Sequence, residues 1–246
     1  MAKTALITGG GSGIGRACAK TLGENGYHVI VTGRRMEPLQ ETVDMIGADA
    51  SAITADVTDE AEVDALYAKI EADHGRLDVL FNNAGNNVPA APVGDVPVSD
   101  FIKVMNVNIL GAFICARGAF NLMRRQDPQG GRIINNGSIS AYVPRPGSAP
   151  YTTSKHAITG MTRTISLDGR PYNIACGQID IGNTASDMTS QMGAGVPQAD
   201  LSIKPEPVMD VSNVANSVLH MADLPLEANV QFITVMATAM PFIGRG

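Results

Sequence analysis

The sequence predicts an α/β protein whose sheet is doubly wound and mostly parallel. Short runs of β-branched and apolar residues alternate along the chain with segments of helical period, the order typical of βαβ units. With 246 residues, 44% of them hydrophobic, the chain can bury a sizeable core within one domain. About seven strands are expected, at residues 4–8, 28–32, 51–55, 78–82, 132–136, 173–177 and 230–235.

Two of the intervening segments carry helix signals. Between residues 55 and 78 apolar residues recur at helical spacing, and Thr58 or Asp59 is placed to cap the helix. A second capped stripe follows Asp210. Because no repeat or linker interrupts this order, residues 1–246 are expected to form one domain. The least regular stretch, residues 182–207, is long for a loop, and a substrate lid is expected at about residues 184–209.

Composition narrows the class of protein. The net charge of −6 leaves no basic surplus to displace counterions from phosphates, which argues against a nucleic-acid partner. The three cysteines lie far apart, which fits a reducing compartment and neither a disulfide framework nor a metal site. The start lacks a secretory pattern, and no run of 18 apolar residues predicts a membrane span. A cytoplasmic protein without a metal is expected.

Glycine is in excess at 26 residues, and five of these glycines lie between Gly9 and Gly15. They join the first strand to a helix-forming segment. In that context Gly9 allows a tight turn, Gly13 lets the backbone approach a pyrophosphate, and Gly15 lets helix and strand pack closely. A glycine-rich turn alone is a weak signal, but its place between strand and helix favours a bound dinucleotide. The expected contacts are Gly9, Ser12, Gly13, Ile14 and Gly15.

The end of the second strand bears on the choice of dinucleotide. A carboxylate there would accept hydrogen bonds from the adenosine ribose and disfavour a 2′-phosphate. The sequence instead has Arg34 and Arg35, with no carboxylate until Glu37. Arg34 is suited to clamp a 2′-phosphate, although solvated arginines at a helix start are an alternative. NADP is therefore favoured over NAD as the cofactor.

Tyr151 and Lys155 stand four residues apart in a helix-forming segment, so both side chains share one face. A phenol has a pKa of about 10, and a neighbouring ammonium favours the phenolate, which brings proton transfer closer to neutral pH. Such pairs also arise by chance in amphipathic helices. Ser138, at the end of an expected strand, brings a hydroxyl to the same edge of the sheet.

Together these motifs resemble the short-chain dehydrogenase/reductase family of the Tyr-x3-Lys type, which has a Rossmann-like fold. TGGGSGIG matches the family's glycine motif, and residues 82–85 match its NNAG. The segment NVNILGAF carries the asparagine of the family's active site as Asn108, and Ser138, Tyr151 and Lys155 have the family's spacing. The resemblance runs from residue 4 to about residue 164.

The resemblance implies hydride transfer between a nicotinamide and a carbonyl or secondary alcohol of a small molecule. Tyr151 would carry the proton, Lys155 would lower the tyrosine pKa and hold the nicotinamide ribose, and Ser138 would hydrogen-bond the substrate oxygen. Asn108 would kink its helix and hold a relay water. A homo-oligomer, tetramer or dimer, would form through long helices near residues 99–123. Further cofactor contacts would come from Asp56, Val57, Asn83, Ala84, Gly85 and Thr184.

The match weakens after the tyrosine helix. Gly177 stands where the family has an asparagine, and Ile181 where it has a proline. Loss of the proline is expected to loosen the backbone and to alter the contacts to the nicotinamide. Thr184 falls where a backbone group normally holds the carboxamide.

Two other functions use the same scaffold. A sensor would bind NADP without turnover, whereas a lyase or dehalogenase would have no use for the lysine or the glycine loop. All four residues of the expected catalytic set are retained, namely Asn108, Ser138, Tyr151 and Lys155. Because their roles depend on one another, an oxidoreductase is favoured.

Overall fold

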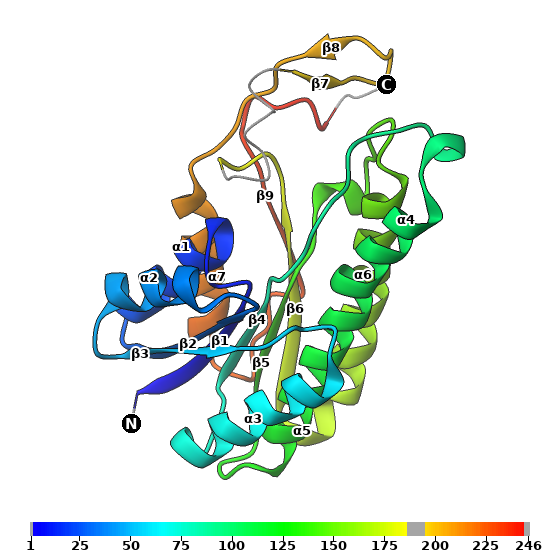
Figure 1. Ribbon diagram of the computed structural model, residues 1–246. Helices are drawn as coiled ribbons and strands as arrows, with labels where there is room; N and C mark the ends of the chain where they lie inside the picture. Colours follow the sequence, from blue (N-terminus) through cyan, green and yellow to red (C-terminus); the bar gives the residue numbers. More distant parts are fainter. Residues whose placement is uncertain (1, 186–194, 244–246) are drawn as a thin grey trace.

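A seven-stranded parallel sheet forms the centre of the computed structural model, which describes residues 2–185 and 195–243 (Figure 1). The strand order is β3-β2-β1-β4-β5-β6-β9. All seven predicted strands are confirmed, with small shifts at their ends and a longer β6. They are β1 (Lys3–Thr8), β2 (Tyr27–Gly33), β3 (Ala50–Thr54), β4 (Val79–Asn82), β5 (Gly131–Asn136), β6 (Ile174–Ile181) and β9 (Phe232–Val235).

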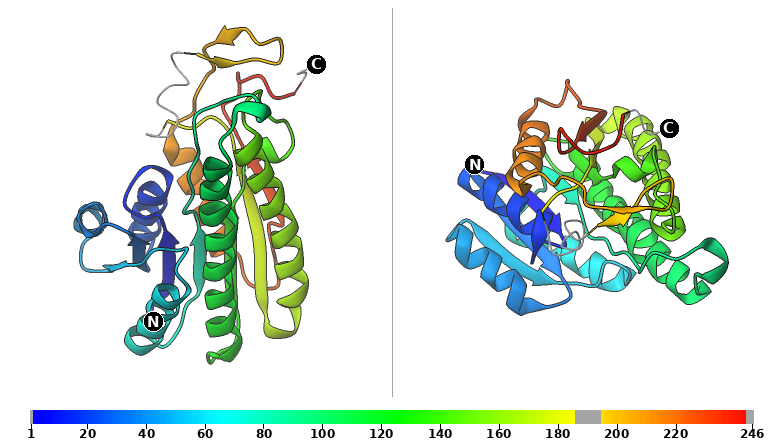
Figure 2. Two further views of the ribbon diagram at one scale, coloured as in Figure 1. Left: turned by 45° about the vertical axis from the view of Figure 1, so that its right-hand side comes forward. Right: turned by 90° about the horizontal axis from the view of Figure 1, so that it is seen from above.

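Helices cover both faces of the sheet, which confirms the doubly wound fold (Figures 1 and 2). One face carries α1 (Gly13–Glu24), α2 (Met36–Ile46) and α7 (Val211–Asp223). The other carries α3 (Glu60–His74), α4 (Val98–Met105), α5 (Ala112–Arg125) and α6 (Ala149–Asp168). Short 3-10 turns lie at Val93–Asp95, Ile139–Ala141 and Arg170–Tyr172.

The strands are buried on both sides because their alternate residues enter two separate cores. On β1, Ala5 and Ile7 pack with α1 and α7, whereas Leu6 packs with α3 and α5. All three side chains are fully buried. Burying a side chain the size of leucine or isoleucine stabilises a fold by about 1.5–3 kcal/mol. The central strands can therefore be apolar at successive positions, as a two-faced parallel sheet requires.

The predicted helix starts are also confirmed. At α3 the carboxylate of Asp59, rather than Thr58, accepts hydrogen bonds from the backbone N of Ala61 and Glu62. At α7 the carboxylate of Asp210 accepts one from the backbone N of Ser212. Each cap satisfies amide groups that the helix itself leaves unpaired and contributes about 1 kcal/mol.

Helices α4 and α5 are joined by a π-helix (Asn106–Gly111) into one continuous helical segment, Val98–Arg125. By length and composition alone this segment could cross a membrane, a test that core helices also pass. Here Cys115, Ala119 and Leu122 of α5 are fully buried against α3 and the sheet. The α5 part of this segment therefore packs one face into the core of the fold.

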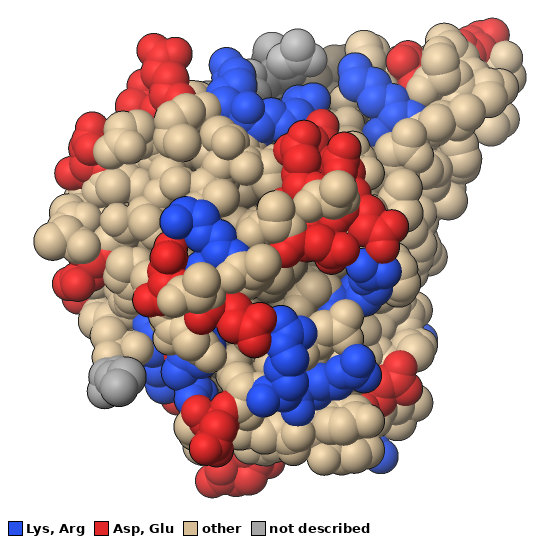
Figure 3. All heavy atoms as spheres, turned by 60° about the horizontal axis from the view of Figure 1, so that its bottom comes forward, with Lys and Arg blue, Asp and Glu red and all other residues tan. Residues whose placement is uncertain are grey.

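Positively and negatively charged side chains lie close together on the face of the molecule shown in Figure 3. Ion pairs join α5 to α3, including Arg117–Glu60 at 2.7 Å and Arg125–Glu71 at 2.5 Å. These side chains are exposed, so each pair contributes no more than about 1 kcal/mol.

The predicted lid falls partly within the described residues. Residues 186–194 lie outside them, and the remainder includes a small antiparallel hairpin, β7 (Val196–Pro197) with β8 (Ile203–Lys204). The hairpin stands beyond the carboxyl ends of the sheet strands (Figure 1). Glu206, which follows it, pairs with Arg145 and accepts a hydrogen bond from Asn183 Nδ2 at 2.7 Å. The chain after the hairpin is thereby tied to the end of β6.

Candidate active site

The glycine-rich loop turns sharply between β1 and α1. Gly9 and Gly13 have positive φ angles of 65° and 48°, which favour glycine. A Cβ on Gly15 would lie 2.2 Å from the carbonyl oxygen of Gly9, so no larger residue fits there. The loop and the start of α1 thus have the close packing that was predicted, and they leave the backbone of the loop accessible at the carboxyl edge of the sheet.

Thr8 joins this loop to the end of β4. Its Oγ1 accepts hydrogen bonds from the backbone N of Asn83 and of Ala84, both at 2.9 Å. The Asn83 side chain donates to the Thr8 carbonyl oxygen at 2.9 Å and accepts a bond from Asn136 Nδ2 at the same distance. The ends of β1, β4 and β5 are therefore held together, although the sequence analysis gave no role to Thr8 or Asn136.

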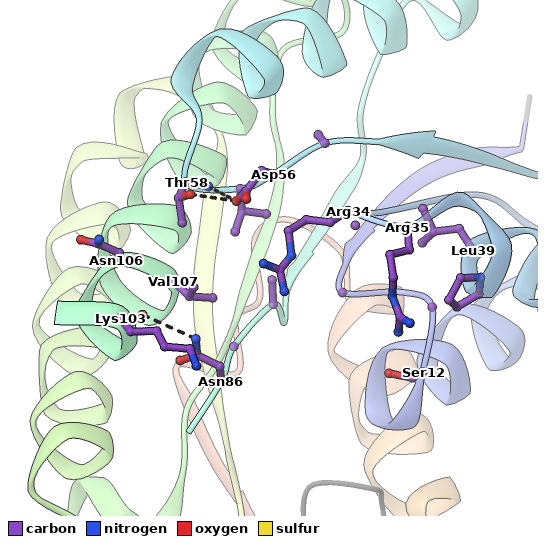
Figure 4. Close-up of a pocket in the computed structure, with 18 of the residues that line it drawn as sticks. Ser12, Arg34, Arg35, Leu39, Asp56, Thr58, Asn86, Lys103, Asn106 and Val107 are labelled. Atoms are coloured by element: carbon purple, nitrogen blue, oxygen red, sulfur yellow. Dashed lines mark hydrogen bonds between the residues drawn. The ribbon is translucent and has the colours of Figure 1, made fainter. Parts of the chain in front are cut away.

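A cleft of about 570 Å³ opens beside the loop (Figure 4). It brings together predicted residues that follow the carboxyl ends of β1, β2, β3 and β4, namely Gly9, Ser12, Arg34, Asp56, Val57, Ala84 and Gly85. It also contains residues that the sequence analysis did not select for this role, among them Arg35, Thr58 and Lys103. No local pattern marks Lys103, since it lies on α4, far in sequence from the glycine loop and from Arg34.

The two arginines after β2 lie differently in this cleft. In Figure 4 the Arg34 side chain points toward the middle of the cleft, whereas the Arg35 side chain points toward Ser12 on the glycine loop. The Asp56 carboxylate accepts hydrogen bonds from the Thr58 backbone N at 3.0 Å and from its hydroxyl at 2.8 Å. The bond from the Thr58 backbone is the main cause that lowers the pKa of Asp56, with Arg34 adding to it. The cleft therefore combines two guanidinium groups with one fixed carboxylate.

A second cleft of about 240 Å³ continues along the same edge of the sheet. It shares Gly9, Ser12, Ala84 and Gly85 with the first, so the two form one groove. The predicted residues Gly13, Ile14, Gly15, Asn83, Tyr151, Lys155 and Thr184 line this part. The groove thus connects the glycine loop to the tyrosine–lysine pair, at the edge where open parallel sheets bind ligands.

Tyr151 and Lys155 lie one turn apart on α6. The Lys155 ammonium is 5.4 Å from the centroid of the Tyr151 ring and donates a hydrogen bond to the Asn136 carbonyl oxygen at 2.7 Å. Lys155 is buried, with 6% of its surface exposed. The two side chains therefore lie side by side at the edge of the groove.

Asn108 lies in the π-helix, so the predicted local distortion of its helix is present. Its side chain accepts a hydrogen bond from the Asn86 backbone N at 2.8 Å and donates to the Asn86 carbonyl oxygen at 3.0 Å. It also donates to Ser154 Oγ at 3.1 Å. Because Ser154 precedes Lys155 on α6, this bond connects Asn108 to the helix of the tyrosine–lysine pair.

Ser138 follows β5 and is buried. Its hydroxyl accepts a hydrogen bond from the Ser140 backbone N at 3.1 Å and makes a long one, 3.5 Å, to the carbonyl oxygen of Ile181. Its own backbone N donates to the carboxylate of Asp180 at 3.0 Å. Ile181 and the neighbouring Gly137 both line the second part of the groove, so Ser138 adjoins it.

The expected loosening of the backbone at Ile181 is wrong. Strand β6 continues through Ile181, which pairs with Val235 of β9, and the Gly182 backbone N donates to the Val235 carbonyl oxygen at 2.8 Å. Without a proline the residue can take a normal place in the strand. Gly177 pairs with Ile134 of β5, and a Cβ there would lie 2.1 Å from the Val230 carbonyl oxygen, so the site has no room for a side chain.

A glycine loop and a tyrosine–lysine pair joined by one groove define an oxidoreductase of the dinucleotide-binding class. The chain matches the short chain dehydrogenase family over residues 3–196. It is 32% identical over 197 residues to a 3beta-hydroxysteroid dehydrogenase of Mediterraneibacter gnavus, which covers 79% of this chain and 70% of that relative. The chain belongs to the short-chain dehydrogenase family, which confirms the resemblance and the enzyme class.

Two solved structures share the whole fold. ElxO with NADP bound has a TM-score of 0.84 and 29% identity, covering 96% of this chain and 97% of that one. NAD+-bound xylitol dehydrogenase has a TM-score of 0.86 and 27% identity, covering 95% and 97%. One of these proteins holds NADP and the other NAD+, so the fold serves both dinucleotides.

Proposed function

We propose that the protein is an NADP(H)-dependent oxidoreductase that transfers a hydride between the nicotinamide and a carbonyl or secondary alcohol of a small molecule. One observation carries the proposal: a single groove contains the glycine loop and, at one end, Tyr151 and Lys155. Their geometry supports a dinucleotide lying along the groove, with its reactive end beside the tyrosine.

Each residue of the catalytic set has its own role in proton transfer. Tyr151 gives a proton to the substrate oxygen during reduction and takes it back during oxidation. Lys155, held by the Asn136 carbonyl, provides the positive charge beside the phenol and a donor for the nicotinamide ribose. Ser138 donates to the substrate oxygen, and Asn108 holds a water that relays protons to Lys155. A bound nicotinamide supplies or accepts the hydride.

The loop fits the phosphates of such a cofactor because Gly9, Gly13 and Gly15 add no side chain to the groove at the start of α1, where unpaired backbone N–H groups favour an anion. We assign the cofactor to the residues that line the groove. They are Gly9, Ser12, Gly13, Ile14, Gly15, Arg34, Asp56, Val57, Asn83, Ala84, Gly85, Tyr151, Lys155 and Thr184.

The preference for NADP rests on Arg34, with Arg35 as a second cation in the same cleft. A guanidinium binds a 2′-phosphate with two parallel hydrogen bonds, whereas NAD offers it a hydroxyl only. Asp56 lies after β3, and its carboxylate is engaged by Thr58. We therefore expect the arginines, rather than this carboxylate, to set the preference.

The proposal extends to the domain organisation, the cellular location and the oligomeric state. We propose one domain over residues 1–246 with residues 184–209 as a substrate lid, in a cytoplasmic enzyme. Exposed apolar side chains on Val98–Arg125 support a homo-oligomer, a dimer or tetramer, because such patches mark subunit contacts. They are Phe101, Ile102, Leu110 and Phe113. Sedimentation of the wild type and of a Phe113→Asp variant tests this, and a wild-type monomer at micromolar concentration would refute it.

The function is tested by binding and turnover together. NADPH and NADH are titrated by nicotinamide fluorescence, and panels of ketones and secondary alcohols are screened for hydride transfer. Turnover by the wild type and its loss in Tyr151→Phe are expected. Failure to bind either nucleotide would refute the whole assignment. Binding without turnover across the panels would point to a sensor instead.

A further inference from the structure

A buried carboxylate that the mechanism above does not use lies next to Ser138. Asp180 is on β6 and is fully buried. Its Oδ1 accepts hydrogen bonds from the Ser138 backbone N at 3.0 Å and from Gln178 Nε2 at 2.7 Å. Its Oδ2 accepts one from the Tyr142 hydroxyl at 3.0 Å.

Gln178 carries the connection on to α6. Its Nε2 also donates to Thr159 Oγ1 at 3.0 Å, and its Oε1 accepts a hydrogen bond from Thr162 Oγ1 at the same distance. Both threonines are on the helix that bears Tyr151 and Lys155. A continuous path of hydrogen bonds therefore runs from the Ser138 backbone through Asp180 and Gln178 to α6.

Tyr142 is anchored at the other end of the carboxylate. It lies four residues after Ser138, and 50% of its surface is exposed, while its hydroxyl reaches inward to Asp180. Ser138 and Tyr142 flank the same short 3-10 turn, Ile139–Ala141, so the buried hydroxyl of Ser138 and the half-exposed ring belong to one segment.

A carboxylate in this place is costly, which argues for a role beyond filling space. Burial raises the pKa of Asp180, and the three hydrogen bonds together with the Lys155 charge act in the opposite direction. An apolar side chain of similar volume avoids the desolvation cost. The turn before Ser138 is also shaped around the carboxylate, because a Cβ on Gly137 would lie 2.1 Å from Asp180 Oδ1.

We propose that Asp180 is a positioning residue for the reaction: it fixes the Ser138 backbone relative to α6 and anchors Tyr142 as a wall of the substrate site. It acts through these two residues and does not touch the reacting atoms. The inference rests on the proposed function for the roles of Ser138 and Tyr151.

Three variants separate the parts of this proposal. Asp180→Ala removes every acceptor, and Asp180→Asn keeps an acceptor for Ser138 while it removes the charge. Tyr142→Phe removes only the anchor of the ring. Each is measured for kcat and KM with the best ketone of the panel, for NADPH affinity, and for hydrogen–deuterium exchange of a peptide covering residues 137–142.

In Asp180→Ala we expect exchange in residues 137–142 to accelerate at least about tenfold and kcat to fall by a factor of about 10–100. NADPH affinity should stay within about twofold, because Asp180 lies off the cofactor groove. Asp180→Asn should recover both exchange protection and kcat to within about threefold of the wild type. Tyr142→Phe should raise KM several-fold with kcat and exchange unchanged.

A matched control is the Asp223–Tyr27 pair, in which the Tyr27 hydroxyl donates to Asp223 Oδ1 at 2.8 Å away from the groove. Asp223→Asn should leave kcat, KM and exchange in residues 137–142 unchanged.

Unchanged exchange in Asp180→Ala, or faster exchange with an unchanged kcat, would overturn the proposal. If Asp180→Ala does not fold, the other two variants decide whether the proposal holds.

A loss of turnover of about 100-fold in Asp180→Asn would show that the charge of Asp180, rather than its position, matters. An unchanged KM in Tyr142→Phe would show that Asp180 does not anchor Tyr142 for substrate binding. A wild type that binds NADPH but turns over no ketone refutes the proposed function. In that case hydrogen–deuterium exchange of residues 137–142 in Asp180→Ala still shows whether Asp180 fixes the Ser138 backbone.

Discussion

Lys155 lies beside the ring of Tyr151, with its ammonium 5.4 Å from the ring centroid and hydrogen-bonded to the Asn136 carbonyl oxygen. The charge is held between α6 and the end of β5 with only 6% of the residue exposed. A lysine so placed loses much of its freedom to move before any ligand arrives. This preorganisation is what an electrostatic role beside a proton-transferring phenol requires.

Replacement of Lys155 by methionine should keep the shape of the side chain and remove its charge. We expect kcat to fall by about 10²–10⁴-fold, because proton transfer by Tyr151 loses its supporting cation. NADPH binding should also weaken. Stopped-flow hydride transfer and fluorescence titration measure the two effects. Lys69→Met, which removes an exposed lysine paired with Asp73 on α3, is the control and should change neither. A wild-type kcat in Lys155→Met would contradict the assigned role.

Replacement of Arg34 by alanine should weaken NADPH selectively. Hydrogen bonds to a charged group contribute about 1.5–3 kcal/mol, so the Kd for NADPH should rise by about 10–100-fold while that for NADH changes little. Adding Arg35→Ala should weaken NADPH further, since both arginines line the cleft. Arg125→Ala, on the exposed pair with Glu71, should leave both affinities unchanged. Equal losses for NADPH and NADH would show that Arg34 does not read the 2′-phosphate.

Two glycine-to-alanine variants should have opposite effects. At Gly15 a Cβ would lie 2.2 Å from the Gly9 carbonyl oxygen, so Gly15→Ala should destabilise the fold by about 1–3 kcal/mol and impair NADPH binding. At Gly160, inside α6, a Cβ meets no described atom within 4 Å. Gly160→Ala should therefore stabilise the fold by about 0.5–1 kcal/mol. Urea unfolding of both variants checks this, and a stable, NADPH-binding Gly15→Ala protein would contradict the steric argument.

His28 should make the fold sensitive to mild acid. Burial is the main cause that lowers its pKa, and His74, whose ring centroid is 4.4 Å away, adds to it. Within the described part of the chain, His28 Nε2 is buried without a hydrogen-bond partner. The pKa of His28 is lower in the folded state than in the unfolded state, where it has about the ordinary value of 6.5. The unfolded state therefore binds a proton first as the pH falls below about 6.5, and the free energy of unfolding decreases.

The measurement is the free energy of unfolding at pH 7.5 and pH 5. The decrease toward pH 5 should be smaller in His28→Phe than in the wild type, because phenylalanine does not titrate. His156→Gln changes an exposed histidine on α6 and should leave the wild-type decrease in place. An identical decrease in the wild type and His28→Phe would exclude His28 as its source.

The sequence patterns were sufficient for the parts of the fold that depend on local order. The strands follow from β-branched runs, and the cap at Asp59 follows from its place before an apolar stripe. The glycine loop could be predicted because its residues are consecutive, so that one segment contains the whole conformational requirement. The tyrosine–lysine pair could be predicted for a similar reason, since one helical turn sets its geometry.

Other parts depend on packing between distant segments. Asp180 contacts Ser138, 42 positions earlier in the sequence, only because β5 and β6 pair side by side. Lys103 reaches the cleft because α4 lies across from the end of β2, which no spacing in the sequence specifies. The strand continues through Ile181 because Val235 of β9 supplies the partner, and that residue is far along the chain.

Gly177 shows how a departure from the family pattern can be fixed by its neighbours. The Val230 carbonyl oxygen occupies the space where a side chain at position 177 would begin. An asparagine, which the family pattern implies at this position, therefore does not fit in this chain unless the segment before β9 moves. Consensus design, which stabilises many proteins by restoring the common residue, should leave this glycine in place. Any future chimera that borrows β6 from a relative must bring the segment before β9 with it.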